Sequence, residues 1–302
     1  MSGVGATFLY LHTTDADVAY AQQVNGVGGA GTVPFGQVGS LGPHHEPGFR
    51  TTATMAFSAC SSLVLGYSFF ESDSIDAIGI PSVAGGGVNS LVHHPAALIT
   101  GSSGPVSAAY DVDFQLADFA YRSILKATDT YAINWSAGGR YASLTQDFRS
   151  LGTFSGGQSG SILTQSNIDF DGGGLTFGLD GERRFGASGL SMYSKGTLGA
   201  LSGRFHADYL LNNNSVGTAP IGAIAIADWE ENRIVTTLDL EAGLHWTSKK
   251  RRVRASAGYM VSFWFNTMTT SEFINSVQAN NFVNADDTLM FEGLTTSLEL
   301  RF

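Results

Sequence analysis

The twelve residues FEGLTTSLELRF, Phe291 to Phe302, alternate between two kinds of side chain. Its even positions become fully apolar toward the C-terminus, and its odd positions carry Thr295, Ser297, Glu299 and Arg301. Successive side chains of a β-strand point to opposite faces, so this segment predicts a strand with one apolar and one polar side. A soluble β-protein also contains such strands, so the pattern has to be followed through the rest of the chain.

Ten segments share this alternation. They lie at about 4–12, 48–59, 62–71, 106–124, 130–147, 164–184, 190–210, 230–247, 251–266 and 288–302. Nearly all reach the roughly 9–11 residues that a tilted strand needs to cross a bilayer. Within 164–184 the alternation slips by one residue at Gly172–Gly174, where we expect a β-bulge.

The connections between these segments are alternately long and short. The long ones are 13–47, 72–105, 148–163, 211–229 and 267–287, and the short ones are 60–61, 125–129, 185–189 and 248–250. An outer-membrane barrel has short periplasmic turns and long extracellular loops, and its even strand number brings both termini to the short-turn end. We therefore predict an all-β fold, a transmembrane antiparallel up-and-down β-barrel of about ten strands that forms one domain, 1–302.

The composition fits this prediction and excludes other classes. Only 14% of the 302 residues are charged, and the net charge is −10, which argues against nucleic-acid binding. The single cysteine, Cys60, excludes an intramolecular disulfide. No signal peptide is recognisable, and we interpret the chain as the mature form of an exported protein. A soluble ten-stranded sandwich or lipocalin-like barrel is the alternative, disfavoured because the polar faces are rich in Gly, Ser and Thr.

Five stretches resemble the pore-forming outer-membrane proteins related to the Legionella major outer membrane protein. They are DVDFQLADFAYR (Asp111–Arg122), INWSAGGRYASL (Ile133–Leu144), FDGGGLTFGLDGERRF (Phe170–Phe185), LDLEAGLHWT (Leu238–Thr247) and the closing FEGLTTSLELRF. The resemblance implies an outer-membrane barrel of pore or porin type, without catalytic residues to transfer. The terminal Phe302 resembles the signal by which barrel assembly machinery recognises outer-membrane strands.

If the apolar faces meet lipid, the polar faces line the lumen. The charged candidates for this lining are Arg50, Asp111, Asp113, Arg140, Asp180, Glu182, Arg184, Asp239, Glu241, Arg254, Glu299 and Arg301. Their signs are mixed, so we expect them to form ion pairs across neighbouring strands, with Glu299 and Arg301 next to Arg254. Such a lumen predicts a porin-like channel for ions or small polar solutes.

Two other functions stay open at this point. Because barrel diameter grows with strand number and about eight strands leave room only for side chains, a ten-stranded barrel can instead be a structural protein of low conductance that packs laterally or binds partners by its outer loops. The other is a barrel hydrolase, which would carry His and acidic residues together at its outer rim. The pairs His44–His45 and His93–His94 lie in long loops but show no recognisable metal or catalytic pattern. We therefore expect no enzyme, no catalytic residues, no metal and no cofactor.

The predicted surroundings follow from the barrel. We expect outer-membrane lipid and lipopolysaccharide around the wall and the barrel assembly machinery as a partner during insertion. A homo-oligomer or an envelope protein is a further expected partner, and nucleic acid is not.

Overall fold

A computed structural model describes residues 2–26, 31–97, 101–102, 104–154, 159–186, 188–216, 221–283 and 285–302. Its strands are β1 (Gly3–Thr14), β2 (Val18–Val24), β3 (Pro34–Leu41), β4 (Glu46–Ala56), β5 (Ser61–Ile78), β6 (Gly87–Ser90), β7 (Gly101–Ser102), β8 (Val106–Ala127), β9 (Tyr131–Phe154), β10 (Gly160–Arg184), β11 (Leu190–Asn213), β12 (Gly222–Thr247), β13 (Val253–Thr267) and β14 (Asp287–Arg301). One helix, α1 (Thr270–Ala279), lies between β13 and β14. Among the described residues, no helix has the length and apolarity needed to cross a membrane.

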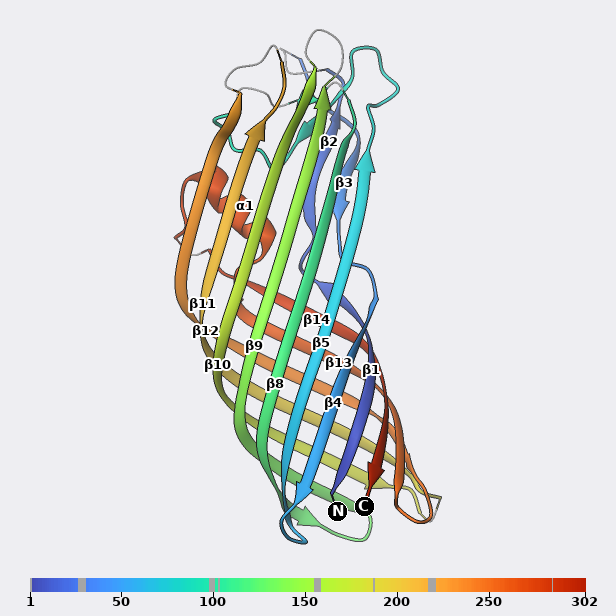
Figure 1. Ribbon diagram of the computed structural model, residues 1–302. Coiled ribbons are helices and arrows are strands. Elements are labelled where there is room, and N and C mark those ends of the chain that lie inside the picture. Colours follow the sequence, from blue (N-terminus) through green and yellow to red (C-terminus); the bar gives the residue numbers. More distant parts are fainter. Residues whose placement is uncertain are drawn as a thin grey trace.

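Ten strands close into one antiparallel barrel in the order β1-β14-β13-β12-β11-β10-β9-β8-β5-β4. The C-terminal strand completes the ring, because β14 pairs with β13 on one side and with β1 on the other. The ten predicted strands and the barrel are thus confirmed. Both termini lie at the end of the short turns (Figure 1).

The barrel wall is much taller on one side than on the other. Strands β8 to β12 have 22 to 26 residues, whereas β13, β14, β1 and β4 have 11 to 15. The tall strands extend past the closed ring as a curved half-wall, shown with α1 beside it in Figure 1. Helix α1 contacts β9, β10 and β11 and also β2.

The two longest predicted loops contain structure of their own. Region 13–47 includes β2 and β3, region 72–105 includes β6 and β7, and these form a second sheet in the order β3-β2-β6-β7. Strand β5 also continues to Ile78, beyond its predicted end. In the fifth long connection, α1 begins after Thr269. The Thr269 hydroxyl caps the helix, because it accepts a hydrogen bond from the backbone N–H of Glu272. The helix ends at Asn280, which adopts the left-handed conformation (φ 51°).

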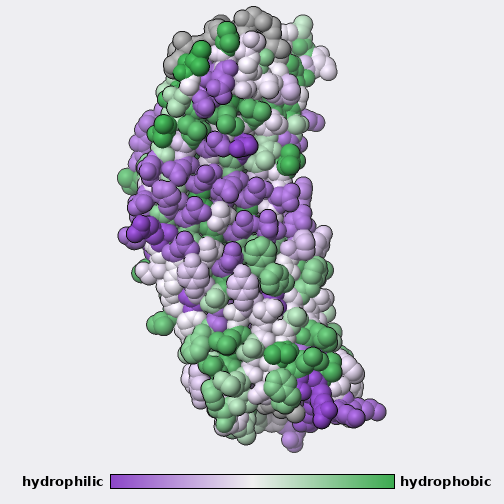
Figure 2. All heavy atoms as spheres, in the orientation of Figure 1, coloured by the Kyte–Doolittle hydropathy of each residue, from purple (hydrophilic) through white to green (hydrophobic). Residues whose placement is uncertain are grey.

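The outer surface has two zones along the strands. Near the short turns, large apolar side chains project outward: Leu175, Phe177 and Leu179 on β10, and Leu240, Leu244 and Trp246 on β12. Farther up, a broad hydrophilic band crosses the wall, and hydrophobic and hydrophilic residues are mixed above this band (Figure 2). An exposed apolar wall of this kind requires a hydrocarbon surrounding. The lower zone is therefore the membrane-spanning part, and the hydrophilic zone lies outside the bilayer.

The inner surface is apolar in the upper part of the barrel and charged near the short turns, and β10 shows this change. In the upper part Ile168 and Phe170 are buried inside while Asp169 and Asp171 are exposed. In the lower part Leu175 and Phe177 point outward. Pairing with β9 and β11 runs without a register shift through Gly172–Gly174. The predicted bulge is therefore wrong. The slip in alternation marks the level at which the apolar face of the strand changes from inside to outside.

Candidate functional site

The lumen of the membrane-spanning zone contains a network of ion pairs that crosses the barrel. Arg140 on β9 lies at its centre and is nine-tenths buried. Its Nε donates to Asp118 Oδ1 on β8 at 2.7 Å, and its Nη1 donates to Asp239 Oδ2 on β12 at 2.6 Å. Since β9 and β12 are not neighbours in the barrel, this side chain ties opposite parts of the wall together.

A second group of lumen charges joins β4 to β12. Arg50 Nη1 donates to Glu241 Oε2 at 3.1 Å, and the Tyr193 hydroxyl donates to Glu241 Oε1 at 2.7 Å. Lys195 Nζ lies 3.8 Å from the same carboxylate. Glu241 therefore faces three donors, which compensates the loss of its hydration inside the barrel.

The third group lies closer to the short-turn end. Arg254 Nη2 donates to Glu182 Oε2 at 2.6 Å, and His245 Nε2 lies 3.2 Å from the other oxygen of Glu182. Arg122 pairs with Asp180, which also accepts from Asn134 at 2.7 Å. At the opening itself Arg301 donates to Glu299 at 2.9 Å.

The structure places ten of the twelve predicted lumen residues on the inner face or at its opening: Arg50, Arg140, Asp180, Glu182, Arg184, Asp239, Glu241, Arg254, Glu299 and Arg301. Arg254 is the register neighbour of Glu299, as expected, although its hydrogen bond goes to Glu182. Sequence reasoning missed Asp118, Arg122, Lys195 and His245, which belong to the same network. The available signal was strand phase: Asp118 and Arg122 lie four residues apart on one face of β8, and His245 shares a face of β12 with Glu241.

Two predicted lumen residues are placed differently. Asp111 and Asp113 lie on the outer wall, because Tyr110, Val112 and Phe114 of the same strand occupy the inner face and are buried. The prediction that they line the lumen is wrong for a physical reason. Above the membrane the strand faces water outside and an apolar core inside, so its polar residues point outward.

Several carboxylates lie close together on this outer wall, and the pKa of Asp113 is perturbed there. Burial, reinforced by Glu71, Asp111 and Asp147, raises the pKa of Asp113 from 3.8 to about 6. Between these two values the folded protein retains a proton that the unfolded chain has released. The free energy of unfolding therefore falls as pH rises across this window, and the full penalty is present above about pH 6.

We expect Asp113→Asn to stabilise the barrel at pH 8 and to leave its stability unchanged at pH 4. Urea midpoints measured from pH 4 to pH 8 in detergent check this. Asp129→Asn, in the short turn after β8, serves as the control and should show no such pH-dependent gain. An equal gain at both pH values would show that charge is not the cause.

Above the ion pairs the lumen is filled by aromatic side chains. Phe291 on β14 packs edge-on against Phe114 on β8, with ring centroids 4.7 Å apart. Phe70 and Trp264 complete this group, 5.8 and 6.2 Å from the Phe291 ring. We call these four residues the aromatic plug. All four are buried, and they come from β5, β8, β13 and β14, so they close the space between opposite walls.

Helix α1 covers the plug from above. The Gln146 side chain on β9 donates to the Met268 carbonyl at 2.8 Å and accepts from the Thr270 amide at 3.1 Å, and both contacts are buried. Below the plug, a cavity of about 120 Å³ is lined by Arg50, Arg122, Lys195, Glu241 and Arg254. A wider opening of about 510 Å³ follows at the short-turn end, lined by Arg184, Lys249 and Arg301. Neither lining includes a residue of the aromatic plug.

The histidine pairs do not come together in one cluster. His45 stacks on Tyr10 and His12, while His94 Nε2 lies 3.3 Å from Asn280 Oδ1. His206 is different: on the outer wall it lies within 4 Å of three carboxylates, those of Asp208, Asp228 and Glu230. Sequence reasoning did not find this group, because it depends on the register between β11 and β12.

An apolar outer band, a charged lumen and closure of the sheet on itself define an outer-membrane β-barrel protein. The family of the Legionella pneumophila major outer membrane protein precursor matches residues 2–302, and the chain belongs to this family. Its location is accordingly the bacterial outer membrane. No curated protein matches the chain.

Solved structures of outer-membrane proteins match the chain to different degrees. The outer membrane protease OmpT from Escherichia coli has a TM-score of 0.55 at 9% identity, covering 99% of this chain and 97% of that chain. The toluene transporter TbuX from Ralstonia pickettii has a TM-score of 0.28 at 8% identity, covering 100% and 90%. The expectation that the chain is not an enzyme is corrected by the first of these, since an outer membrane protease shares its fold. At such identity the likeness shows the fold alone.

Proposed function

We propose that this chain is a closed outer-membrane barrel that anchors a rigid extramembrane wall and lid, and that it acts through contacts made above the membrane. The aromatic plug carries this proposal. Phe70, Phe114, Trp264 and Phe291 are buried between opposite walls, and the start of α1 is hydrogen-bonded to Gln146 on β9. Burial of each such ring contributes about 1.5–3 kcal/mol, so a water-filled path through this level would be costly.

The extramembrane part has the properties of a binding platform. Strands β9, β10 and β11 are paired on both sides over almost their whole length, which makes the wall rigid, and its inner face is packed against α1 and the small sheet. Its outer face is polar. This arrangement supports contacts with an envelope protein or a second copy of the chain, and the charged lumen below braces the anchor.

A second candidate, a gated channel, is favoured by the cavities below the plug. They are lined by charged residues and lie on the short-turn side of the barrel, as in a permeation path that is interrupted once. Helix α1 lies within the connection between β13 and β14, so a displacement of this connection would be the opening movement. The two candidates differ in whether the barrel conducts.

Planar-bilayer recordings with a disulfide variant distinguish them. The exposed Cys60 is first replaced by serine, and Gln146→Cys and Thr270→Cys are then added, since these side chains lie in hydrogen-bond contact. We expect no discrete conductance steps under oxidising or reducing conditions, while a known trimeric porin inserted in parallel gives steps. The single-cysteine variants are the matched controls.

Two results would overturn the closed barrel. Steps that appear under reducing conditions and vanish on oxidation would show a channel gated by α1. Steps that persist in both conditions would show a path that bypasses the helix.

A further inference from the structure

The outer wall above the membrane carries two rows of acidic residues in register across six strands. One row is Asp73, Asp111, Asp147, Asn167, Asp208 and Asp228, and the next is Glu71, Asp113, Thr145, Asp169, His206 and Glu230. Neither row contains a lysine or an arginine. Like charges directly opposite each other on neighbouring strands are destabilising, so these rows create a demand for cations. His206 is the only side chain in them with a basic nitrogen.

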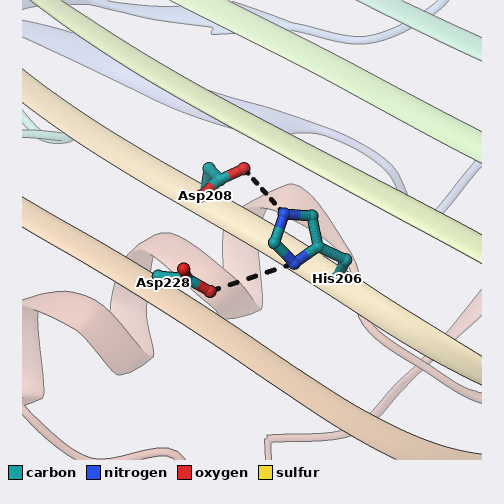
Figure 3. A group of neighbouring side chains, drawn as sticks. All are labelled: His206, Asp208 and Asp228. Carbon is teal, nitrogen blue, oxygen red and sulfur yellow. Dashed lines mark ion pairs between the residues drawn. The ribbon is translucent and has the colours of Figure 1, made fainter.

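His206 is held by Asp208 in a defined orientation. Its Nε2 lies 3.1 Å from Asp208 Oδ2, two residues along β11, so this side of the ring faces the Asp208 carboxylate (Figure 3). The other ring nitrogen, Nδ1, faces β12. It lies 3.5 Å from Glu230 Oε1 and 3.9 Å from Asp228 Oδ1, both on β12. Nδ1 is buried and makes no hydrogen bond.

Nδ1 thus faces one oxygen of each of two carboxylates, while Arg204 Nη1 lies 3.8 Å from the other oxygen of Glu230, Oε2. In a tetrahedral site with metal–ligand distances of about 2.0–2.2 Å, neighbouring ligand atoms are about 3.4 Å apart. The distance from Nδ1 to Glu230 Oε1, 3.5 Å, is close to this value, and the distance from Nδ1 to Asp228 Oδ1, 3.9 Å, is somewhat longer. Asp208 has the place of the carboxylate that typically orients a metal-bound imidazole through its other nitrogen.

We propose that His206, Asp228 and Glu230 bind a divalent transition-metal ion on the extramembrane wall, with Asp208 as the positioning residue. One imidazole and two carboxylates, with water completing the coordination, suit Zn²⁺ or Co²⁺. Ca²⁺ and Mg²⁺ prefer ligand sets made of oxygen alone. The site faces the extracellular side, and it does not depend on whether the lumen conducts.

Titration of the metal-stripped, folded full-length protein with Co²⁺ tests this site. We expect one ion per chain and a visible absorption band typical of tetrahedral cobalt, which Zn²⁺ abolishes and excess Ca²⁺ does not. His206→Gln and Glu230→Gln should weaken binding at least tenfold and remove the band. Asp208→Asn should keep the band but weaken binding about 10–100-fold, as for other residues that orient a ligand.

Two controls separate this site from other binding. His44→Gln removes an exposed loop histidine and should leave binding unchanged. The double variant Asp111→Asn/Asp147→Asn removes charge from the rows but none of the ligands, and should change affinity less than threefold. The proposal is overturned if the wild-type protein binds no Co²⁺, if His206→Gln binds as well as wild type, or if only the double variant loses binding. Unchanged migration of unheated samples in gels confirms that each variant is folded.

Discussion

Replacing Arg140 by methionine is expected to destabilise the barrel by about 3–5 kcal/mol, the usual cost of removing one partner from a buried ion pair. Methionine preserves most of the volume but leaves Asp118 and Asp239 without their shared donor. Both partly buried carboxylates then remain in the lumen without this cation, and among the described residues only Asp239 keeps a further donor, the Ser262 hydroxyl. The midpoint of urea unfolding in lipid vesicles, followed by tryptophan fluorescence, measures this loss.

The compensated variant makes the test specific. If charge imbalance is the cause, Arg140→Met combined with Asp118→Asn and Asp239→Asn should recover most of the stability, because neutral replacements of a whole buried ion group are often tolerated. Arg204→Met is the matched control: its side chain is 64% exposed on the outer wall, so less than about 0.5 kcal/mol should be lost. A single variant as stable as wild type would show that the network does not brace the barrel.

The barrel was predictable because the lipid-facing residues follow a local rule. On β12, Leu240, Leu244 and Trp246 alternate with Glu241 and His245 within a few residues, and no knowledge of a partner strand is needed to see it. The strict alternation of long and short connections fixed the strand number and placed the termini. For the same reason, most of the charged lumen residues could be named from their phase alone.

The change of the apolar side chains from the inner to the outer face along a strand could not be predicted in the same way. On β8 the apolar positions change from Tyr110, Val112 and Phe114 to Phe119 and Tyr121, which occupy opposite faces. A phase slip in sequence has two physical causes, an inserted residue or a change of surroundings. Only the unbroken register distinguishes them, and it is set by pairing with the neighbouring strands.

The group around His206 was hidden for a related reason. The patterns His206-x-Asp208 and Asp228-x-Glu230 were visible as side chains sharing a strand face. Whether the four residues meet depends on the register of β11 against β12, which places Asp208 opposite Asp228. Likewise, the inner packing of α1 follows from the unequal strand heights, a property of the whole barrel.

The aromatic plug provides the second large expected effect: Phe291→Ala should destabilise the protein by about 3–5 kcal/mol, as for other buried phenylalanines. The Phe291 ring is fully buried and contacts Phe70, Phe114 and Trp264, so its removal leaves a cavity that strands of a closed barrel cannot collapse to fill. Phe291→Leu, which retains most of the volume, should lose less than about 1.5 kcal/mol. Urea midpoints in vesicles measure both variants. Equal losses would mean that the residue acts through its aromatic character, and no loss in either would mean that the lumen at this level is already open to water.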